Sequence, residues 1–153
     1  MQAARTIYRY WITLVWLAVV AQIAAAAYGA FYTADKLNSQ SGPDEGRTVS
    51  ETVFDHGFGF HTAFGYLIFV GALVLLVLAL VARVGRPRIW LVVAVPVAVA
   101  VQIVLAWISE AVHGVGILHG LNALVVFGLT GYLTGEAWRG RRAAPVESVT
   151  TGA

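Results

Sequence analysis

Cysteine is absent from this sequence, and charged side chains are scarce. Without cysteine the chain can form no disulfide bond and can offer no thiolate to a metal ion. Charged residues make up 12% of the chain, whereas soluble domains carry about 25%. The net charge of +2 at pH 7 gives no basis for a nucleic acid as partner. These shortages exclude both a disulfide scaffold and an ordinary soluble domain.

Hydrophobic residues make up 59% of the chain, and they fall into four long segments. Each segment can cross the bilayer core of about 30 Å, which needs roughly 20 helical residues. Backbone polar groups must be satisfied inside lipid, so the segments are expected to be helices. We therefore predict an all-α fold, a four-transmembrane-helix bundle forming one membrane domain over residues 1–141. Its helices are predicted at about 10–32, 60–82, 89–108 and 117–138, with a long outer loop at 33–59 and a disordered cytoplasmic tail at 142–153.

The first segment has features of both a secretory signal and a membrane anchor. Arg5 and Arg9 precede it, as in a signal peptide. Its apolar stretch is long for a signal, and Trp11 and Trp16 suit a membrane anchor. We predict a retained helix.

Basic residues are distributed unevenly between the two sides of the predicted membrane domain. Only Lys36 and Arg47 fall on one side, and six of the eight acidic residues gather there. By the positive-inside rule, the other side is cytoplasmic and holds both termini. This predicts a multi-pass protein of the plasma membrane, with its four histidines on the extracellular side. The other eight of the ten basic residues are Arg5, Arg9, Arg83, Arg86, Arg88, Arg139, Arg141 and Arg142.

The two halves of the chain resemble each other around these histidines. One half contains His56-Gly-Phe-Gly-Phe-His61, and the other contains His113-Gly-Val-Gly-Ile-Leu-His119. The preceding helix of each half carries a glutamine, Gln22 or Gln102, at a matching position. We interpret this pattern as two repeated helical hairpins related by a pseudo-two-fold axis along the membrane normal.

His61 and His119 are the strongest candidates for a chemical role. The predicted symmetry places them face to face across the bundle, where two imidazoles can bind the two axial positions of haem b. Gly65 and Ala123 are small enough to let a flat ring approach the backbone, and Phe64 could pack on its edge. Glycine-rich faces also join helices without a cofactor, so this alternative stays open for the small residues.

His56 and His113 form a second pair, predicted in a loop or at the membrane interface. They could bond haem propionates, bind a quinone, or complete a different metal site. Glu110 stands three residues before His113, so on a helical turn the carboxylate would share a face with that imidazole and orient it. Gln22 and Gln102 are predicted to bond each other across the bundle, with contact to a cofactor as the alternative.

The pattern of helices and histidines resembles one four-helix half of the heme A synthase family. Each half of those enzymes has histidines on its second and fourth helices near the outer face, and one pair holds haem b. The resemblance covers all four helices and implies His61 and His119 as the pair, with Glu51 or Glu110 at the family's acidic position. Gly57 and Thr62 stand where the family has a basic residue, and a second half is absent. Haem binding is therefore implied, but hydroxylation of a haem substrate is not.

The chain is also similar to small four-helix membrane proteins of actinobacteria. Three hypotheses follow from these observations. The first is a membrane haem b protein that transfers electrons near the outer surface, alone or in a respiratory or redox complex. The second is a zinc or copper protein, and the third is a structural or assembly subunit without a cofactor. The second would use a cluster of His56, His61, Glu110, His113 and His119.

Overall fold

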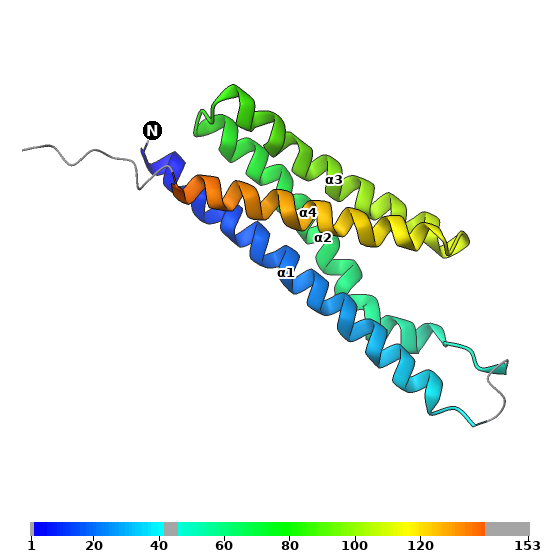
Figure 1. Ribbon diagram of the computed structural model, residues 1–153. Coiled ribbons are helices and arrows are strands. Elements are labelled where there is room, and N and C mark those ends of the chain that lie inside the picture. The colour runs from blue at the N-terminus through cyan, green and yellow to red at the C-terminus, as the bar shows by residue number, and fades with distance from the viewer. Residues whose placement is uncertain (1, 42–45, 140–153) are drawn as a thin grey trace, which may run out of the picture.

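The computed structural model describes residues 2–41 and 46–139, and it is an all-α four-helix bundle (Figure 1). The predicted fold class is confirmed. All four helices are long and apolar enough to cross a membrane. The predicted tail at 142–153 lies outside the described residues. The helices are α1 (Gln2–Asn38), α2 (Glu51–Val81), α3 (Arg86–Ala111) and α4 (Val115–Arg139).

Two helices extend well beyond the predicted spans. Helix α1 has 37 residues and is therefore about 55 Å long, which exceeds the thickness of a bilayer core. Helix α2 begins at Glu51, where the Ser50 side chain accepts a hydrogen bond from the Val53 amide at 3.3 Å. The predicted loop at 33–59 was therefore too long, since only residues 39–50 separate the helices. Hydropathy detects the apolar part of a helix, but polar residues continue the same helix beyond it.

The connections define two ends of the bundle. The arginine end holds the start of α1, the turn at 82–85 and the end of α4. The histidine end holds the α1–α2 and α3–α4 connections. Neighbouring helices run antiparallel, as the short turn before Arg86 requires (Figure 1). In this turn Arg83 has a φ of 52°, the one positive value among the described residues other than glycine.

The buried core lies in the half of the bundle nearer the arginine end. There all four helices interlock around side chains such as Ile12, Leu75 and Leu133, which are almost fully buried. Pro96 is also buried inside α3, where its ring removes one backbone hydrogen bond. A second, smaller cluster follows toward the histidine end, made of Val19, Ile68, Val99 and Val126.

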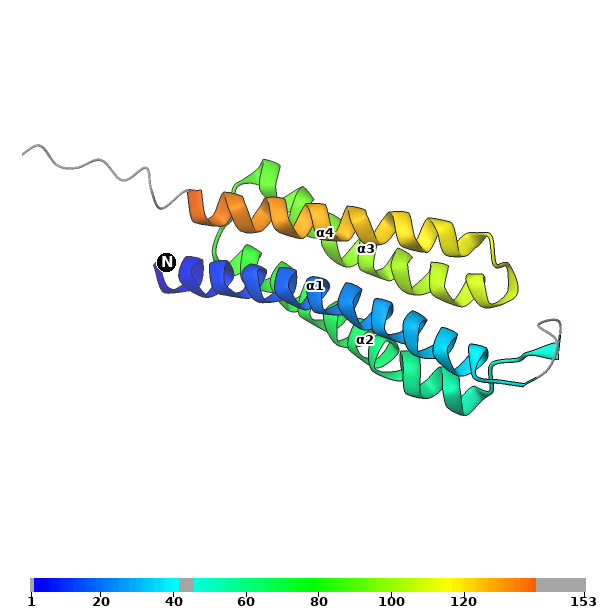
Figure 2. The same ribbon diagram turned by 60° about the horizontal axis from the view of Figure 1, so that its bottom comes forward.

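Beyond this second cluster the two hairpins separate. Figures 1 and 2 both show the α1–α2 pair diverging from the α3–α4 pair toward the histidine end. Helix α3 has no buried residue after Val99, and α4 has none before Val126. The α1–α2 pair remains closed by Gly29 and Gly57, which are both buried. A Cβ added to Gly29 would lie 2.7 Å from the Gly57 carbonyl oxygen. Residues that face the interior near the histidine end are therefore only partly covered by the neighbouring helices.

Candidate functional site between the two hairpins

His61 and His119 meet in the region where the hairpins separate. Their ring centroids are 6.4 Å apart, and the ring planes are inclined by 60°. They come from α2 and α4, which lie diagonally across the bundle and make no close backbone contact. Both side chains are half-buried. The expectation of two facing imidazoles agrees with this geometry, although His61 lies well inside α2 and not in its first turn.

A glutamine on the neighbouring helix holds each histidine through a reciprocal pair of hydrogen bonds. In the first hairpin, Gln22 Nε2 donates to the His61 carbonyl oxygen at 2.6 Å, and His61 Nδ1 lies 3.2 Å from the Gln22 carbonyl oxygen. In the second hairpin, Gln102 Nε2 donates to the His119 carbonyl oxygen at 2.9 Å. His119 Nδ1 lies 3.0 Å from the Gln102 carbonyl oxygen. The same contacts thus occur in both hairpins.

These contacts determine which ring nitrogen carries the proton. A backbone carbonyl oxygen can only accept a hydrogen bond, so Nδ1 of His61 and of His119 must donate. In each neutral imidazole the lone pair then resides on Nε2. A metal-binding histidine usually donates its other ring N–H to a carbonyl or carboxylate in this way, which fixes the ring's orientation.

The predicted bond between Gln22 and Gln102 is wrong, because each amide is engaged within its own hairpin. The two environments also differ. Asn122 Nδ2 donates to Gln102 Oε1 at 2.6 Å and to the Ala98 carbonyl oxygen at 2.9 Å. Gln22 Oε1 is buried and has no hydrogen-bond partner. Phe64 stands three residues after its histidine, as Asn122 does, and has no donor to offer.

Aromatic and small residues form the walls of the site. Phe58 contacts the edge of His61, with ring centroids 6.3 Å apart. Phe64 stacks on Phe60 at 5.1 Å and packs against the second core cluster, so it forms the floor below the histidines. The sequence did not identify Phe58 as a site residue, because the second helix was predicted to start after it. Its i, i+3 spacing to His61 becomes informative once α2 is known to begin at Glu51.

The small residues near the histidines have different roles. Gly57 is occupied by helix packing, because an added Cβ would lie 3.0 Å from Thr33 Oγ1. Gly65 faces Gln22, whose Nε2 would lie 3.1 Å from an added Cβ. Gly120 has open space beside it, and Ala123 is half-buried. Helix packing therefore accounts for Gly57, whereas no neighbouring atom packs against Gly120.

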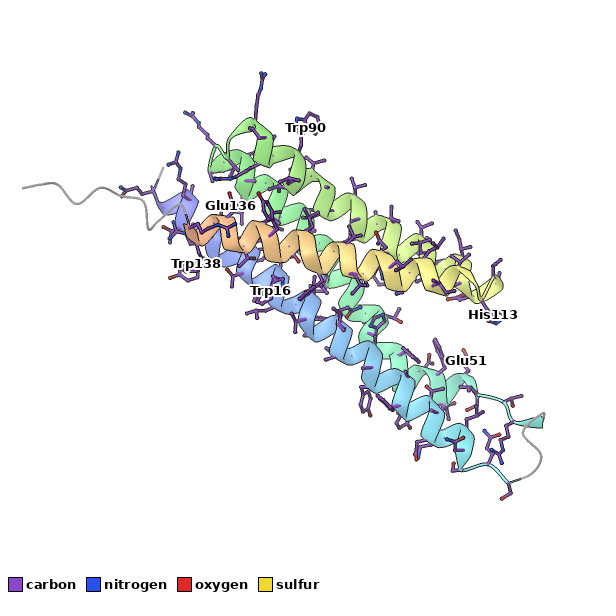
Figure 3. All side chains as sticks on the ribbon, viewed as in Figure 1. Trp16, Glu51, Trp90, His113, Glu136 and Trp138 are labelled. Atoms are coloured by element: carbon purple, nitrogen blue, oxygen red, sulfur yellow. The ribbon has the colours of Figure 1, made fainter. Side chains whose placement is uncertain are left out.

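The second histidine pair does not join the first. His56 lies in α2, not in a loop, and its Nδ1 donates to the Thr52 carbonyl oxygen at 2.7 Å. His113 is exposed in the α3–α4 turn, at the histidine end (Figure 3). Glu110 was predicted to share a helical face with His113, and this is wrong. Helix α3 ends at Ala111, and Val112 leaves the helical conformation with φ −128° and ψ 87°.

The described residues contain no larger cluster of potential metal ligands around the two facing histidines. Within residues 2–41 and 46–139, no three His, Asp or Glu side chains come together as a group able to hold a metal ion. Glu51 begins α2 at the histidine end, where its side chain is exposed (Figure 3).

Comparison with known proteins gives a likeness for the middle of the chain. Residues 52–111 match the model of a family described as a family of unknown function (DUF6220). The matched segment covers almost all of α2 and α3. It contains His61 from one reciprocal pair and Gln102 from the other. No curated protein matches the chain. No solved structure matches it either.

Proposed function

We propose that this protein binds one haem b between its two hairpins and transfers electrons within the membrane. His61 and His119 would hold it, each through Nε2. The observation that carries the proposal is the separation of the two rings, 6.4 Å, with both Nδ1 atoms bonded to carbonyl oxygens.

The ring separation suits two ligands of a single metal ion. Imidazoles on opposite sides of one metal have centroids roughly 6.4 Å apart, because each metal–nitrogen bond is ~2.1 Å and each nitrogen lies ~1.1 Å from its ring centroid. An inclination of 60° between the planes is compatible with this, because an axial imidazole can rotate about its bond to the metal.

The number of ligands favours haem over a bare ion. A zinc or copper site takes three or four ligands from the protein. Haem brings four equatorial nitrogens of its own and needs only two histidines. The described residues offer such a pair and no group of three. The zinc or copper hypothesis thus lacks supporting geometry.

The residues around the pair define what the site can do. With a histidine from each hairpin holding the iron, no ligand position would remain for oxygen, which favours outer-sphere electron transfer. Bound haem supplies a one-electron carrier. The reciprocal glutamine contacts hold the imidazole planes in place. Phe58, beside His61, and Phe64, on the side of the second core cluster, limit the access of water to the site.

The placement of the site in the membrane is part of this proposal. The excess of arginine at the opposite end supports a cytoplasmic arginine end and an extracellular histidine end. The matching Gln–His contacts support descent of the two hairpins from one duplicated unit. A cofactor near the outer surface could exchange electrons with a membrane quinone or with another subunit of a respiratory complex.

The absorption spectrum of the purified protein tests the proposal. Protein from haem-replete cells is expected to show a six-coordinate, low-spin spectrum and one haem b per chain in a haemochrome assay. His61→Ala and His119→Ala should each lower the Soret absorbance per chain at least about tenfold, because one axial ligand is lost. His56→Ala and His113→Ala are the matched controls and should retain the band.

Three results would overturn the proposal. Colourless protein from haem-replete cells would favour the cofactor-free subunit. Stoichiometric zinc or copper, lost in His61→Ala, would favour the bare-metal site. A Soret band that depends on His56 and His113 but not on His61 would place the cofactor elsewhere.

A further inference from the structure

A second site lies at the arginine end, at the far end of the bundle from the histidines. A cavity of about 320 Å³ lies between the start of α1, the α2–α3 turn and the end of α4. Its floor is apolar, since Ala82 and Leu133 are almost fully buried. Its remaining wall is rich in charge, with the side chains of Arg5, Arg9, Arg83, Arg88 and Glu136. Figure 3 shows Glu136 on α4 at this end.

The single carboxylate of the cavity is already neutralised. Glu136 accepts from Arg88 at 3.0 Å and from Arg139 at 2.6 Å. The positive charges that remain are only partly engaged. Arg9 Nε donates to the Ala137 carbonyl oxygen at 3.1 Å. Within the described residues, the side chains of Arg5 and Arg83 make no hydrogen bond and no ion pair. Several guanidinium donors thus remain available to an anion.

The backbone places one of these arginines at a conformational cost. Arg83 adopts a φ of 52°, a left-handed conformation that glycine reaches without steric penalty. The chain reversal therefore does not require an arginine at position 83, because glycine would form the same turn more easily. It adds a cationic group to the cavity wall that glycine would lack. The wall also includes Gly85, directly before α3, where the positive end of the helix dipole adds to the field.

We propose that this cavity binds the phosphate of an anionic phospholipid headgroup. Guanidinium groups recognise phosphate oxygens through paired hydrogen bonds, and several converge here. A zwitterionic headgroup would bring a cation into a cavity that already carries a net positive charge. The cavity lies at the ends of the candidate membrane spans, so a lipid would reach it laterally and its glycerol region would lie on the apolar floor. The proposal is independent of haem binding.

Lipid preference of the purified protein tests this inference. Native mass spectrometry would compare binding of phosphatidylglycerol and phosphatidylcholine from mixed micelles, with inorganic phosphate as a third arm. The wild type should prefer phosphatidylglycerol. Arg83→Gly and Arg5→Gln should each lower that preference about fivefold, because each removes a guanidinium group that lines the cavity. Arg86→Gln is the matched control, because Arg86 is exposed at the same end and does not line the cavity.

The choice of Arg83→Gly separates lipid binding from folding. Glycine suits the positive φ, so this variant should unfold at the same temperature as the wild type or higher, while its lipid preference falls. An equal loss in Arg86→Gln would show a general surface-charge effect and overturn the proposal. An unchanged preference in Arg83→Gly and Arg5→Gln would also overturn it. If inorganic phosphate binds the cavity as well as phosphatidylglycerol does, the assignment of the phosphate to a lipid headgroup is wrong.

Discussion

At the scale of single residues, the site depends on how each histidine is held. The imidazole donates to a carbonyl oxygen of the neighbouring helix, and the glutamine amide returns a bond to the histidine backbone. Each exchange joins two helices at the height of the ring. The glutamines are thus positioning residues, because they fix the place of the histidine backbone without touching the free Nε2.

The two glutamines are expected to contribute unequally to stability. Gln22→Ala removes one interhelical bond, whereas Gln102→Ala also removes the acceptor of Asn122. Such bonds contribute about 0.6 kcal/mol each in membrane proteins, with a maximum near 1.7 kcal/mol. Unfolding of each variant in mixed micelles should therefore show a larger loss for Gln102→Ala. A larger loss for Gln22→Ala would contradict the asymmetry.

At the scale of helices, the first hairpin depends on a close crossing near the site. Gly29→Ala would place a Cβ 2.7 Å from the Gly57 carbonyl oxygen and from the ring of Phe58. The helices must then move apart, at a cost of about 1–3 kcal/mol. Because Phe58 contacts His61, the haem spectrum should shift as well. Thermal unfolding and the Soret maximum provide the two measurements.

Gly59→Ala is the matched control for that crossing. It changes a glycine of α2, the helix that Gly29 crosses, two positions from Gly57, yet an added Cβ meets no atom within 4 Å. The variant should keep the wild-type spectrum and unfold at the same temperature or higher, since alanine favours a helix. Equal destabilisation by the two substitutions would argue against the proposed crossing as the cause.

At the scale of the whole molecule, the proposed orientation can be tested by chemical labelling. The chain has no native cysteine, so single cysteines can be introduced without a background. Ser41→Cys, in the α1–α2 connection, should react with a membrane-impermeant maleimide in intact cells. Arg86→Cys, beside the α2–α3 turn, should react only after the membrane is opened. The reverse pattern would place the histidine end in the cytoplasm.

Haem should also join the two hairpins across the region where they diverge. In the proposed site one ligand would come from each hairpin, so the cofactor would stabilise only the folded state in which His61 and His119 meet. His119→Ala should lower the melting temperature of haem-replete protein by several degrees, whereas His113→Ala should not. In haem-depleted protein, His119→Ala should lose only the smaller contribution of its hydrogen bond to Gln102, and His113→Ala should melt close to the wild type. A similar loss in the depleted protein would assign His119 a packing role instead.

Some features of this protein follow from the sequence by itself. The number of helices could be read from the length of each apolar segment, because bilayer thickness sets a local requirement. The grouping of the histidines at one end follows for the same reason. Each histidine lies near the end of an apolar segment, and those ends reach the same side of the membrane. The facing of His61 and His119 was predicted from the likeness of the two hairpins.

Other features required the tertiary structure, because they depend on how helices rotate and cross. The continuation of α2 back to Glu51 placed Phe58 against His61, and the end of α3 at Ala111 separated Glu110 from His113. The carbonyl that receives each imidazole lies on another helix, far away in sequence. The same holds for the arginine cavity, whose wall comes from three separate parts of the chain. Local sequence determines which segments become helices, whereas packing between distant segments decides which side chains meet.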